Sequence, residues 1–173
     1  MDLKAKIRNI KDFPKKGIVF RDITPLIGDG EALKYTIDAM ADYYKAKKID
    51  SILGAEARGF IFGAALAYRL GIGFIPVRKP GKLPYDTCKV SYDLEYGSNV
   101  MEMHIDAIKP GDNILIVDDL AATGGTAKAQ AELVERNGGK VVGFCFIVEL
   151  EFLNPRDALK GYDVMSLIKY DSE

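Results

Sequence analysis

Short apolar runs alternate with helical patterns over most of the chain. Four runs have the length of strands buried on both faces and end in turn residues, at residues 49–55, 73–77, 114–117 and 141–150. Helices are predicted between or after them, at residues 30–47, 59–70 and 127–136. A short helix after residue 154 and a last strand at residues 164–170 complete the series. This alternation predicts an α/β fold, with a mostly parallel central sheet flanked by helices and right-handed crossovers.

The pattern also predicts how two helices pack. Residues 30–47 carry Leu33 and Ile37 on one face, as an amphipathic helix does. Asp29 stands where a capping side chain belongs. Residues 59–70 are apolar nearly all round, so we expect this helix to be deeply packed.

Three segments interrupt the alternation. Residues 3–10 fit a short helix. Residues 12–25 contain Pro14 and Pro25 and are typical of an irregular connector. Residues 83–96 form a long excursion, and excursions of this length are often lids over a site.

Residues 100–108 alternate as a strand. Met101, Met103 and Ile105 would share its apolar face. His104, the only histidine of the chain, would lie on the solvent side. A single histidine without a Gly-x-Ser-x-Gly turn argues against a serine-hydrolase triad and against a zinc site built from histidines.

Composition places the chain among ordinary globular proteins. Its 173 residues suit one domain, residues 1–173, and no low-complexity linker divides them. A net charge of −1 without a long basic tract argues against nucleic-acid binding. No segment has the length or apolarity of a signal peptide or membrane span, so a cytoplasmic enzyme is expected. Cys88 and Cys145 have no metal-site or disulfide spacing, and Cys145 is expected in the core.

The strongest chemical signal follows the third apolar run. Asp118 and Asp119 come where that strand should end, at the edge where open α/β sheets bind ligands. The small, hydroxyl-rich turn of residues 123–126 then leads into a helix, and such a turn offers free backbone N–H groups to a phosphate. Carboxylates instead accept hydrogen bonds from hydroxyls or hold a hydrated cation. A sugar phosphate meets both demands, although either half alone would fit a simple helix cap or chain turn.

This segment, Val117-Asp-Asp-Leu-Ala-Ala-Thr-Gly-Gly-Thr126, resembles the phosphoribosyl-pyrophosphate motif of the type I phosphoribosyltransferases. The similarity extends over nearly the whole chain and is strongest to the members that act on adenine. It implies a Rossmann-like sheet with a small hood at residues 1–25 and a flexible catalytic loop at residues 83–97. The ribose hydroxyls would bind Asp118 and Asp119. The resemblance gives the 5′-phosphate loop as Ala122, Thr123, Gly124, Gly125 and Thr126.

Basic residues at two other strand ends fit the same picture. Arg58 stands between a strand and a helix, where it could reach phosphate oxygens or form a surface ion pair. Ala55-Glu-Ala-Arg-Gly-Phe60 resembles the family's pyrophosphate loop, which implies a cis peptide between Glu56 and Ala57. The resemblance implies that pyrophosphate contacts Glu56, Ala57, Arg58, Arg78, Lys79 and Lys82.

The resemblance also assigns the base and the catalytic groups. Phe13-Pro-Lys-Lys-Gly-Ile-Val-Phe-Arg-Asp-Ile-Thr-Pro25 is similar to the family's adenine-binding segment. In that segment the main chain of Val19 and Arg21 would bind the base and Phe20 would pack on its face. Leu120 and Leu150 are also implied at the base. In Ser91-Tyr-Asp-Leu-Glu-Tyr-Gly97, Glu95 would act as acid or base toward a purine nitrogen. Tyr96 would close on the reacting groups, beside Arg58.

The activity so implied is purine salvage, in which adenine and phosphoribosyl pyrophosphate give AMP and diphosphate. Mg²⁺ would travel on the substrate's oxygens, without a dedicated protein cage, and the chain would form a homodimer. Another base, such as xanthine, hypoxanthine or orotate, is one alternative. A non-catalytic regulator that senses phosphoribosyl pyrophosphate is another, although this chain lacks a basic nucleic-acid-binding face. A generic nucleotide-binding fold is disfavoured because Walker and Gly-x-Gly-x-x-Gly motifs are missing.

Overall fold

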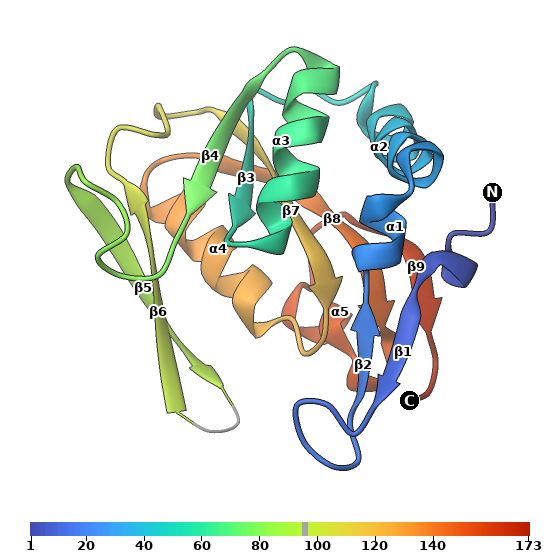
Figure 1. Ribbon diagram of the computed structural model, residues 1–173. Helices are drawn as coiled ribbons and strands as arrows, with labels where there is room; N and C mark the ends of the chain where they lie inside the picture. The colour runs from blue at the N-terminus through green and yellow to red at the C-terminus, as the bar shows by residue number, and fades with distance from the viewer. Residues whose placement is uncertain (95–96) are drawn as a thin grey trace.

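A five-stranded parallel sheet forms the centre of the protein. The computed structural model describes residues 1–94 and 97–173. The sheet has the order β4-β3-β7-β8-β9 (Figure 1). Its strands are β3 (Ser51–Ala55), β4 (Gly73–Val77), β7 (Asn113–Ala121), β8 (Lys140–Leu150) and β9 (Val164–Tyr170). All neighbouring strands are parallel, which confirms the predicted α/β class.

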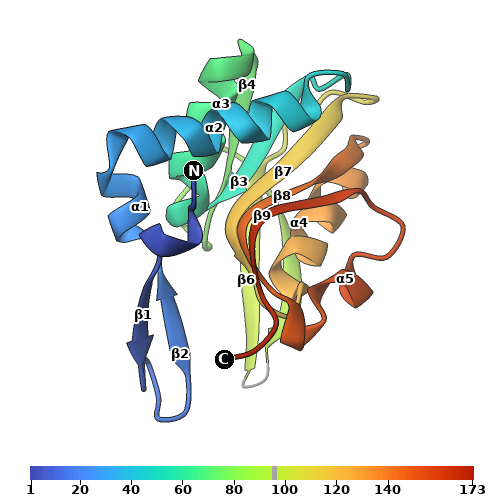
Figure 2. The same ribbon diagram turned by 90° about the vertical axis from the view of Figure 1, so that its right-hand side faces the viewer.

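Helices cover both faces of this sheet. Figure 2 shows α2 (Gly30–Tyr44) and α3 (Arg58–Leu70) on one face and α4 (Gly125–Arg136) on the other. Side chains of β7 alternate between the two resulting cores, with Leu115 and Val117 under α3 and Ile114 and Ile116 under α4. Cys145 is fully buried in the first core, as predicted. The sheet is therefore sandwiched, which explains its continuous apolar runs.

The capping prediction for α2 is confirmed. Asp29 Oδ1 accepts hydrogen bonds from the backbone N–H groups of Glu31 at 3.0 Å and Ala32 at 3.1 Å. The expected all-round burial of α3 is wrong, because one side of that helix faces solvent. On that side Ile61 is 40% exposed and Tyr68 is 91% exposed.

The amino-terminal segment is a hairpin rather than a helix and a loop. After a single 3₁₀ turn (Lys4–Lys6), strand β1 (Arg8–Lys11) pairs antiparallel with β2 (Val19–Asp22). A short helix α1 (Thr24–Gly28) leads into α2. All four residues of β1 are exposed, so the strand carries no apolar alternation from which it could have been predicted. This hairpin, which we call the hood, lies to one side of the sheet in Figure 2, and its Arg21 contacts Tyr170 of β9.

The excursion expected before the alternating strand is itself largely a strand. β5 (Thr87–Leu94) pairs antiparallel with β6 (Gly97–His104), in a register that joins Thr87 to His104 and Leu94 to Gly97. Met101 and Met103 are buried as predicted, but Ile105 lies beyond the strand end and is 46% exposed. His104 is half-buried, and its Nε2 accepts a 3.4 Å hydrogen bond from the Tyr85 N–H.

The polar face of β6 is covered rather than solvated. Glu102 is only 1% exposed, because the β5–β6 hairpin and the preceding basic turn enclose it. Its carboxylate accepts hydrogen bonds from the Gly81 N–H at 2.9 Å and the Thr87 hydroxyl at 3.2 Å. Lys89 Nζ lies 3.3 Å from the same carboxylate. Glu102 therefore ties the hairpin to the turn that carries the predicted basic residues.

Candidate active site

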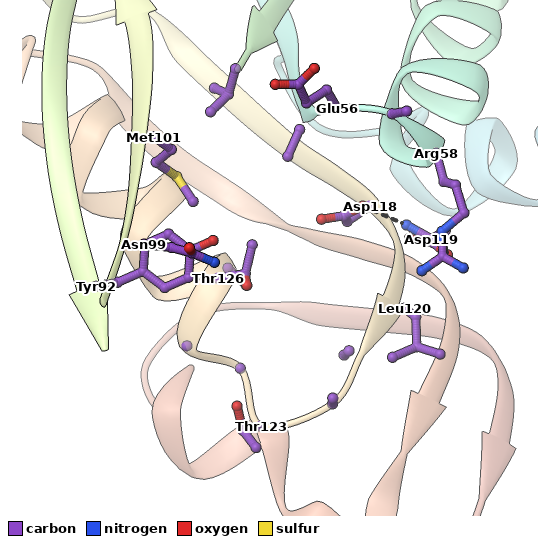
Figure 3. A pocket seen from close by; sticks show the side chains of 18 of the residues that line it. Glu56, Arg58, Tyr92, Asn99, Met101, Asp118, Asp119, Leu120, Thr123 and Thr126 are labelled. Carbon is purple, nitrogen blue, oxygen red and sulfur yellow. Dashed lines mark hydrogen bonds and ion pairs between the residues drawn. The ribbon is translucent and has the colours of Figure 1, made fainter. Parts of the chain in front are cut away.

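A cavity of about 400 Å³ opens at the carboxyl end of the sheet, where the predicted site residues meet. Figure 3 shows it bounded by the end of β7, the start of α3, the loop before α4 and the β5–β6 hairpin. The sequence-predicted residues that line it are Glu56, Ala57, Arg58, Arg78, Lys79, Asp118, Asp119, Leu120, Ala122, Thr123, Gly124, Gly125 and Thr126. Thus the carboxylate pair, the glycine turn and most of the basic residues face one space.

The two carboxylates belong to the last part of β7, which runs further than the apolar residues alone suggested. Asp118 is half-buried and Asp119 is 5% exposed. Asp118 Oδ1 accepts a 2.9 Å hydrogen bond from the Asp119 N–H, and its Oδ2 accepts one from Gln130 Nε2 at 3.3 Å. A Cβ atom on Gly59, in the first turn of α3, would lie 2.9 Å from Asp118 Oδ1. Gly59 therefore lets α3 approach the carboxylate closely.

Asp119 faces the start of α3 and forms the ion pair that was one possibility for Arg58. Arg58 Nε lies 2.9 Å from Asp119 Oδ2. Among the described residues no donor forms a well-aligned hydrogen bond with this oxygen. The contact between Arg58 and Asp119 is therefore an attraction between opposite charges. The Arg58 guanidinium also lies 5.4 Å from the centre of the Phe20 ring. Arg58 thus stands between the carboxylate pair and the hood.

Burial and mutual repulsion change the acidity of this pair. Removal from water, together with the charge of the neighbouring Asp119, raises the pKa of Asp118 to about 8. Burial also raises the pKa of Asp119, although the Arg58 charge opposes this. Two adjacent carboxylates in a partly dry site do not both ionise readily, so without a ligand the pair retains a proton near neutral pH.

We expect the unfolding free energy of the ligand-free protein to fall as pH rises from about 4 to about 8. An unfolded Asp118 loses its proton near pH 3.8, whereas the folded one keeps it until about pH 8. The folded state therefore binds more protons in this window, and the slope from one such group is at most about 1.4 kcal/mol per pH unit. Urea unfolding of the wild type and of Asp118→Asn, at several pH values between about 4 and about 8, measures this slope of the unfolding free energy.

The Asp118→Asn variant should lose most of this slope. Asp38→Asn is a suitable control, because hydrogen bonds from Lys34 and Arg69 lower the pKa of Asp38. Above about pH 5 that carboxylate is ionised in both the folded and the unfolded state, so its removal should leave the slope there unchanged. An equal slope in wild type and Asp118→Asn would contradict the shared-proton interpretation.

The glycine turn has the backbone geometry expected of a phosphate loop. Helix α4 begins at Gly125, two residues earlier than predicted, and Gly124 precedes it with φ 82°. That angle lies in the left-handed region that glycine adopts without strain. Among the described side chains none caps this helix, so its first backbone N–H groups, on residues that line the cavity, have no side-chain acceptor.

The basic side of the cavity begins with the predicted cis peptide. The Glu56–Ala57 bond is cis, as the resemblance implied. The Glu56 carboxylate accepts hydrogen bonds from Arg78 Nη2 at 3.0 Å and from the Lys79 N–H at 2.6 Å. Lys79 is exposed on the cavity wall. Lys82 lies outside this wall, and its carbonyl accepts a 3.4 Å hydrogen bond from Arg78 Nη1.

The residues predicted at the base are more scattered. Leu120 lines the cavity, whereas Val19, Phe20 and Arg21 lie on β2 in the hood and do not. Leu150, at the end of β8, packs against the same core as Leu120 without lining the cavity. Among these residues the structure therefore brings only Leu120 into the cavity itself.

The Arg21 side chain points away from the cavity into a buried position. It is 5% exposed and its guanidinium lies 3.9 Å from the centre of the Tyr170 ring. Arg21 Nη1 donates to Asn9 Oδ1 at 2.8 Å, and Nη2 donates to the Ser172 carbonyl at 3.1 Å. The resemblance assigns only main-chain groups of Arg21 to the base, and this buried position of the side chain is compatible with that assignment.

The predicted catalytic pair, Glu95 and Tyr96, lies outside the described residues. The hairpin on either side of them nevertheless supplies cavity residues that the sequence interpretation missed, namely Tyr92, Asn99 and Met101 (Figure 3). The strand alternation offered a signal for Met101. Gln130 was missed as well, because a glutamine in an amphipathic helix is usually exposed, whereas this one is fully buried against Asp118.

Comparisons with known proteins show which proteins the chain is similar to. The family model of the phosphoribosyl transferase domain matches residues 26–167. Adenine phosphoribosyltransferase of Clostridium perfringens (strain 13 / Type A) is 63% identical over 171 residues, 99% of each chain. The crystal structure of adenine phosphoribosyltransferase from Thermoanaerobacter pseudethanolicus has 54% identity and a TM-score of 0.95, over 98% of both chains. The Saccharomyces cerevisiae enzyme, solved with adenine and an imino-altritol bisphosphate, has 42% identity and a TM-score of 0.91, over 96% of both.

Proposed function

The chain belongs to the phosphoribosyltransferase family, and we infer that it transfers the phosphoribosyl group of 5-phospho-α-D-ribose 1-diphosphate to adenine, giving AMP and diphosphate. One observation carries this inference. The carboxylate pair and the glycine turn, which have opposite preferences for charge, line a single cavity. One phosphorylated pentose can satisfy both, with its hydroxyls on Asp118 and Asp119 and its phosphate on the turn.

Each wall of the cavity has a proposed part in the transfer. The bond from ribose C1′ to a diphosphate oxygen breaks, and a bond from C1′ to a purine ring nitrogen forms. Arg58 and Lys79 would stabilise the charge that develops on the departing diphosphate. Glu95 would accept the proton of the attacking nitrogen, and Tyr96 would close over the reacting groups. The loop and the carboxylates fix the ribose so that C1′ meets both partners.

Two of the basic side chains have acidic partners in the structure. Arg58 is paired with Asp119, and Arg78 is paired with Glu56 through an Nη2–Oε2 contact of 3.0 Å. We propose that diphosphate oxygens replace these carboxylates when the substrate binds. Release of Asp119 from Arg58 would then free its oxygens for a ribose hydroxyl.

Mg²⁺ fits the donors that the cavity offers. Asp118 and Asp119 present hard carboxylate oxygens side by side, and Asp119 Oδ2 is buried without hydrogen-bond alignment in the described chain. The ion would be held chiefly by diphosphate and ribose oxygens, with these two residues beside it, and would neutralise charge on the diphosphate. The part of the chain that the structure describes contains no cluster of three or more His, Cys, Asp and Glu side chains suited to a metal.

A homodimer remains our proposal for the assembly. The exposed side of α3 carries Ile61 and Tyr68, and α2 exposes Tyr35 and Tyr43 at 44% and 48%. Light scattering of the purified protein measures the oligomeric state directly.

No helix in the described part of the chain has the length and apolarity to span a membrane.

The test of function is a base-by-base turnover assay. Purified protein is incubated with phosphoribosyl pyrophosphate, Mg²⁺ and adenine, xanthine, hypoxanthine or orotate in turn, and the nucleotide formed is identified. We expect AMP from adenine and a strong loss of turnover when Mg²⁺ is chelated. If the nucleotide formed contains another base, that base and not adenine is the substrate. Binding of phosphoribosyl pyrophosphate without any product would indicate the regulator.

Gly125→Val is expected to raise KM for phosphoribosyl pyrophosphate by roughly tenfold to a hundredfold, the effect of losing one or two charge-assisted hydrogen bonds. The branched side chain would stand where the backbone must approach the phosphate. Steady-state kinetics with both substrates varied would show it. Gly28→Val is the control, because a Cβ at Gly28 meets no atom within 4 Å. Wild-type KM in Gly125→Val would show that the loop does not bind the phosphate.

A further inference from the structure

The short helix α5 (Pro155–Ala158) lies directly against the phosphate loop (Figure 1). A Cβ atom on Gly124 would lie 2.6 Å from the Pro155 carbonyl oxygen and 2.9 Å from the Ala158 Cβ. Neither distance leaves room for a methyl group. The loop backbone therefore rests on α5, and any displacement of α5 would change where the loop's N–H groups point.

A four-residue helix needs an external anchor, because a single turn is not stable alone. Its anchor is Glu149, near the end of β8. The Arg156 guanidinium meets the Glu149 carboxylate in a two-pronged contact, with Nε to Oε1 at 2.6 Å and Nη2 to Oε2 at 2.8 Å. Such paired contacts fix the orientation of both groups.

The anchor is joined to the site from a second direction. Glu149 stands opposite Ala121 in the β7–β8 register, and Ala121 is the residue directly before the phosphate loop. Its side chain is only 1% exposed, whereas that of Arg156 is 47% exposed. A carboxylate this well removed from water requires a partner, so the pair is more than an incidental surface contact. It connects the strand end beside the loop to the helix behind the loop.

We propose that Glu149 and Arg156 are positioning residues for the 5′-phosphate: their ion pair holds α5 against Gly124 and thereby fixes the loop that receives the phosphate. Neither residue lines the cavity, so each acts through the loop. The proposal rests on the proposed function, because it concerns the phosphate of that substrate. It predicts a selective defect, in which ligands that carry a 5′-phosphate lose affinity while adenine and diphosphate do not.

The test compares Arg156→Met and the conservative Arg156→Lys with wild type. For Arg156→Met we expect KM for phosphoribosyl pyrophosphate and Kd for ribose 5-phosphate to rise roughly tenfold to a hundredfold, as misplacement of a binding group by about 1 Å can produce. KM for adenine and Kd for diphosphate should stay near wild type. Arg156→Lys keeps the charge but loses the paired contact, so its KM for phosphoribosyl pyrophosphate and its Kd for ribose 5-phosphate should lie between those of wild type and Arg156→Met.

Lys34→Met is the control. Lys34 pairs with Asp38 at 2.7 Å on α2, which covers the opposite face of the sheet from α4, so phosphate affinity should be unchanged. Equal losses for adenine and phosphoribosyl pyrophosphate, or no loss in either Arg156 variant, would overturn the proposal. If Arg156→Met does not fold, Arg156→Lys decides the question. A wild type that binds ribose 5-phosphate but makes no AMP would refute the proposed function while leaving this test intact.

Discussion

Replacing Asp118 and Asp119 together by asparagine is expected to lower kcat/KM by roughly two to four orders of magnitude, because two hydrogen bonds to charged acceptors are worth about 1.5–3 kcal/mol each. Asparagine preserves the size of both side chains but removes the charges that attract the ribose hydroxyls. The fold should persist, since the paired carboxylates repel each other and burial disfavours their ionisation.

The experiment combines kinetics with thermal unfolding, and Asp50, which is bonded to the first residue of the same strand, offers a control. Asp50 Oδ2 accepts hydrogen bonds of 2.8 Å from the backbone N–H and the side-chain amide of Asn113, at the opposite end of β7. Asp50→Asn should therefore change the melting temperature without a comparable loss of kcat/KM. Full activity in the double variant would contradict the assignment of ribose binding to these carboxylates. An unfolded double variant would contradict the prediction that the fold persists.

Arg58→Met is expected to lower kcat by roughly a hundredfold to a thousandfold, the range found when one preorganised donor to a developing negative charge is removed. Arg58 stands at the start of α3, 2.9 Å from Asp119 Oδ2, so its loss affects two functions. The leaving diphosphate loses a cation, and Asp119 loses the charge that opposes the rise of its pKa. Methionine retains most of the packing of the arginine stem, which limits the effect to charge and hydrogen bonding.

Arg69 provides the matched control for this substitution. It lies on the same helix and pairs with an aspartate at a similar distance, Nε to Asp38 Oδ1 at 2.8 Å, but on the outer surface. Arg69→Met should keep a kcat close to wild type, because surface ion pairs contribute little. Single-turnover kinetics would locate the Arg58 effect in the chemical step. Similar losses in both variants would mean that the defect is in helix stability rather than in the reaction.

The segment of the chain that sequence interpretation described best is also the most local one. The strand, carboxylate pair, turn and helix of residues 113–136 follow each other without a break, and each has its own physical signal. Hydrophobic runs identify the strand, and glycine identifies the turn. Only the boundaries differed, because β7 continues through Ala121 as long as β8 offers hydrogen bonds.

Features that depend on distant partners could not be predicted in this way. The hood strands have no buried alternating face, and β5 was concealed by its polar residues. Glu102 is charged and lies on the polar side of its strand, yet it is buried because Lys89 and the Gly81 turn meet there. The Arg58–Asp119 pair joins residues that lie in different parts of the sequence. Such contacts follow from tertiary packing, which periodicity does not report.

The anchoring of Arg21 has a consequence for how the protein assembles. Its guanidinium rests on Tyr170 and on the Ser172 carbonyl, which is 151 positions further along the chain. Closing so long a loop is entropically costly, so contacts of this separation form late. β2 is among the first strands to be synthesised, but the contacts of Arg21 can form only after β9 has been synthesised and has joined the sheet. Since we propose that main-chain groups of β2 bind the base, a refolding chain should regain its central sheet before it regains affinity for adenine.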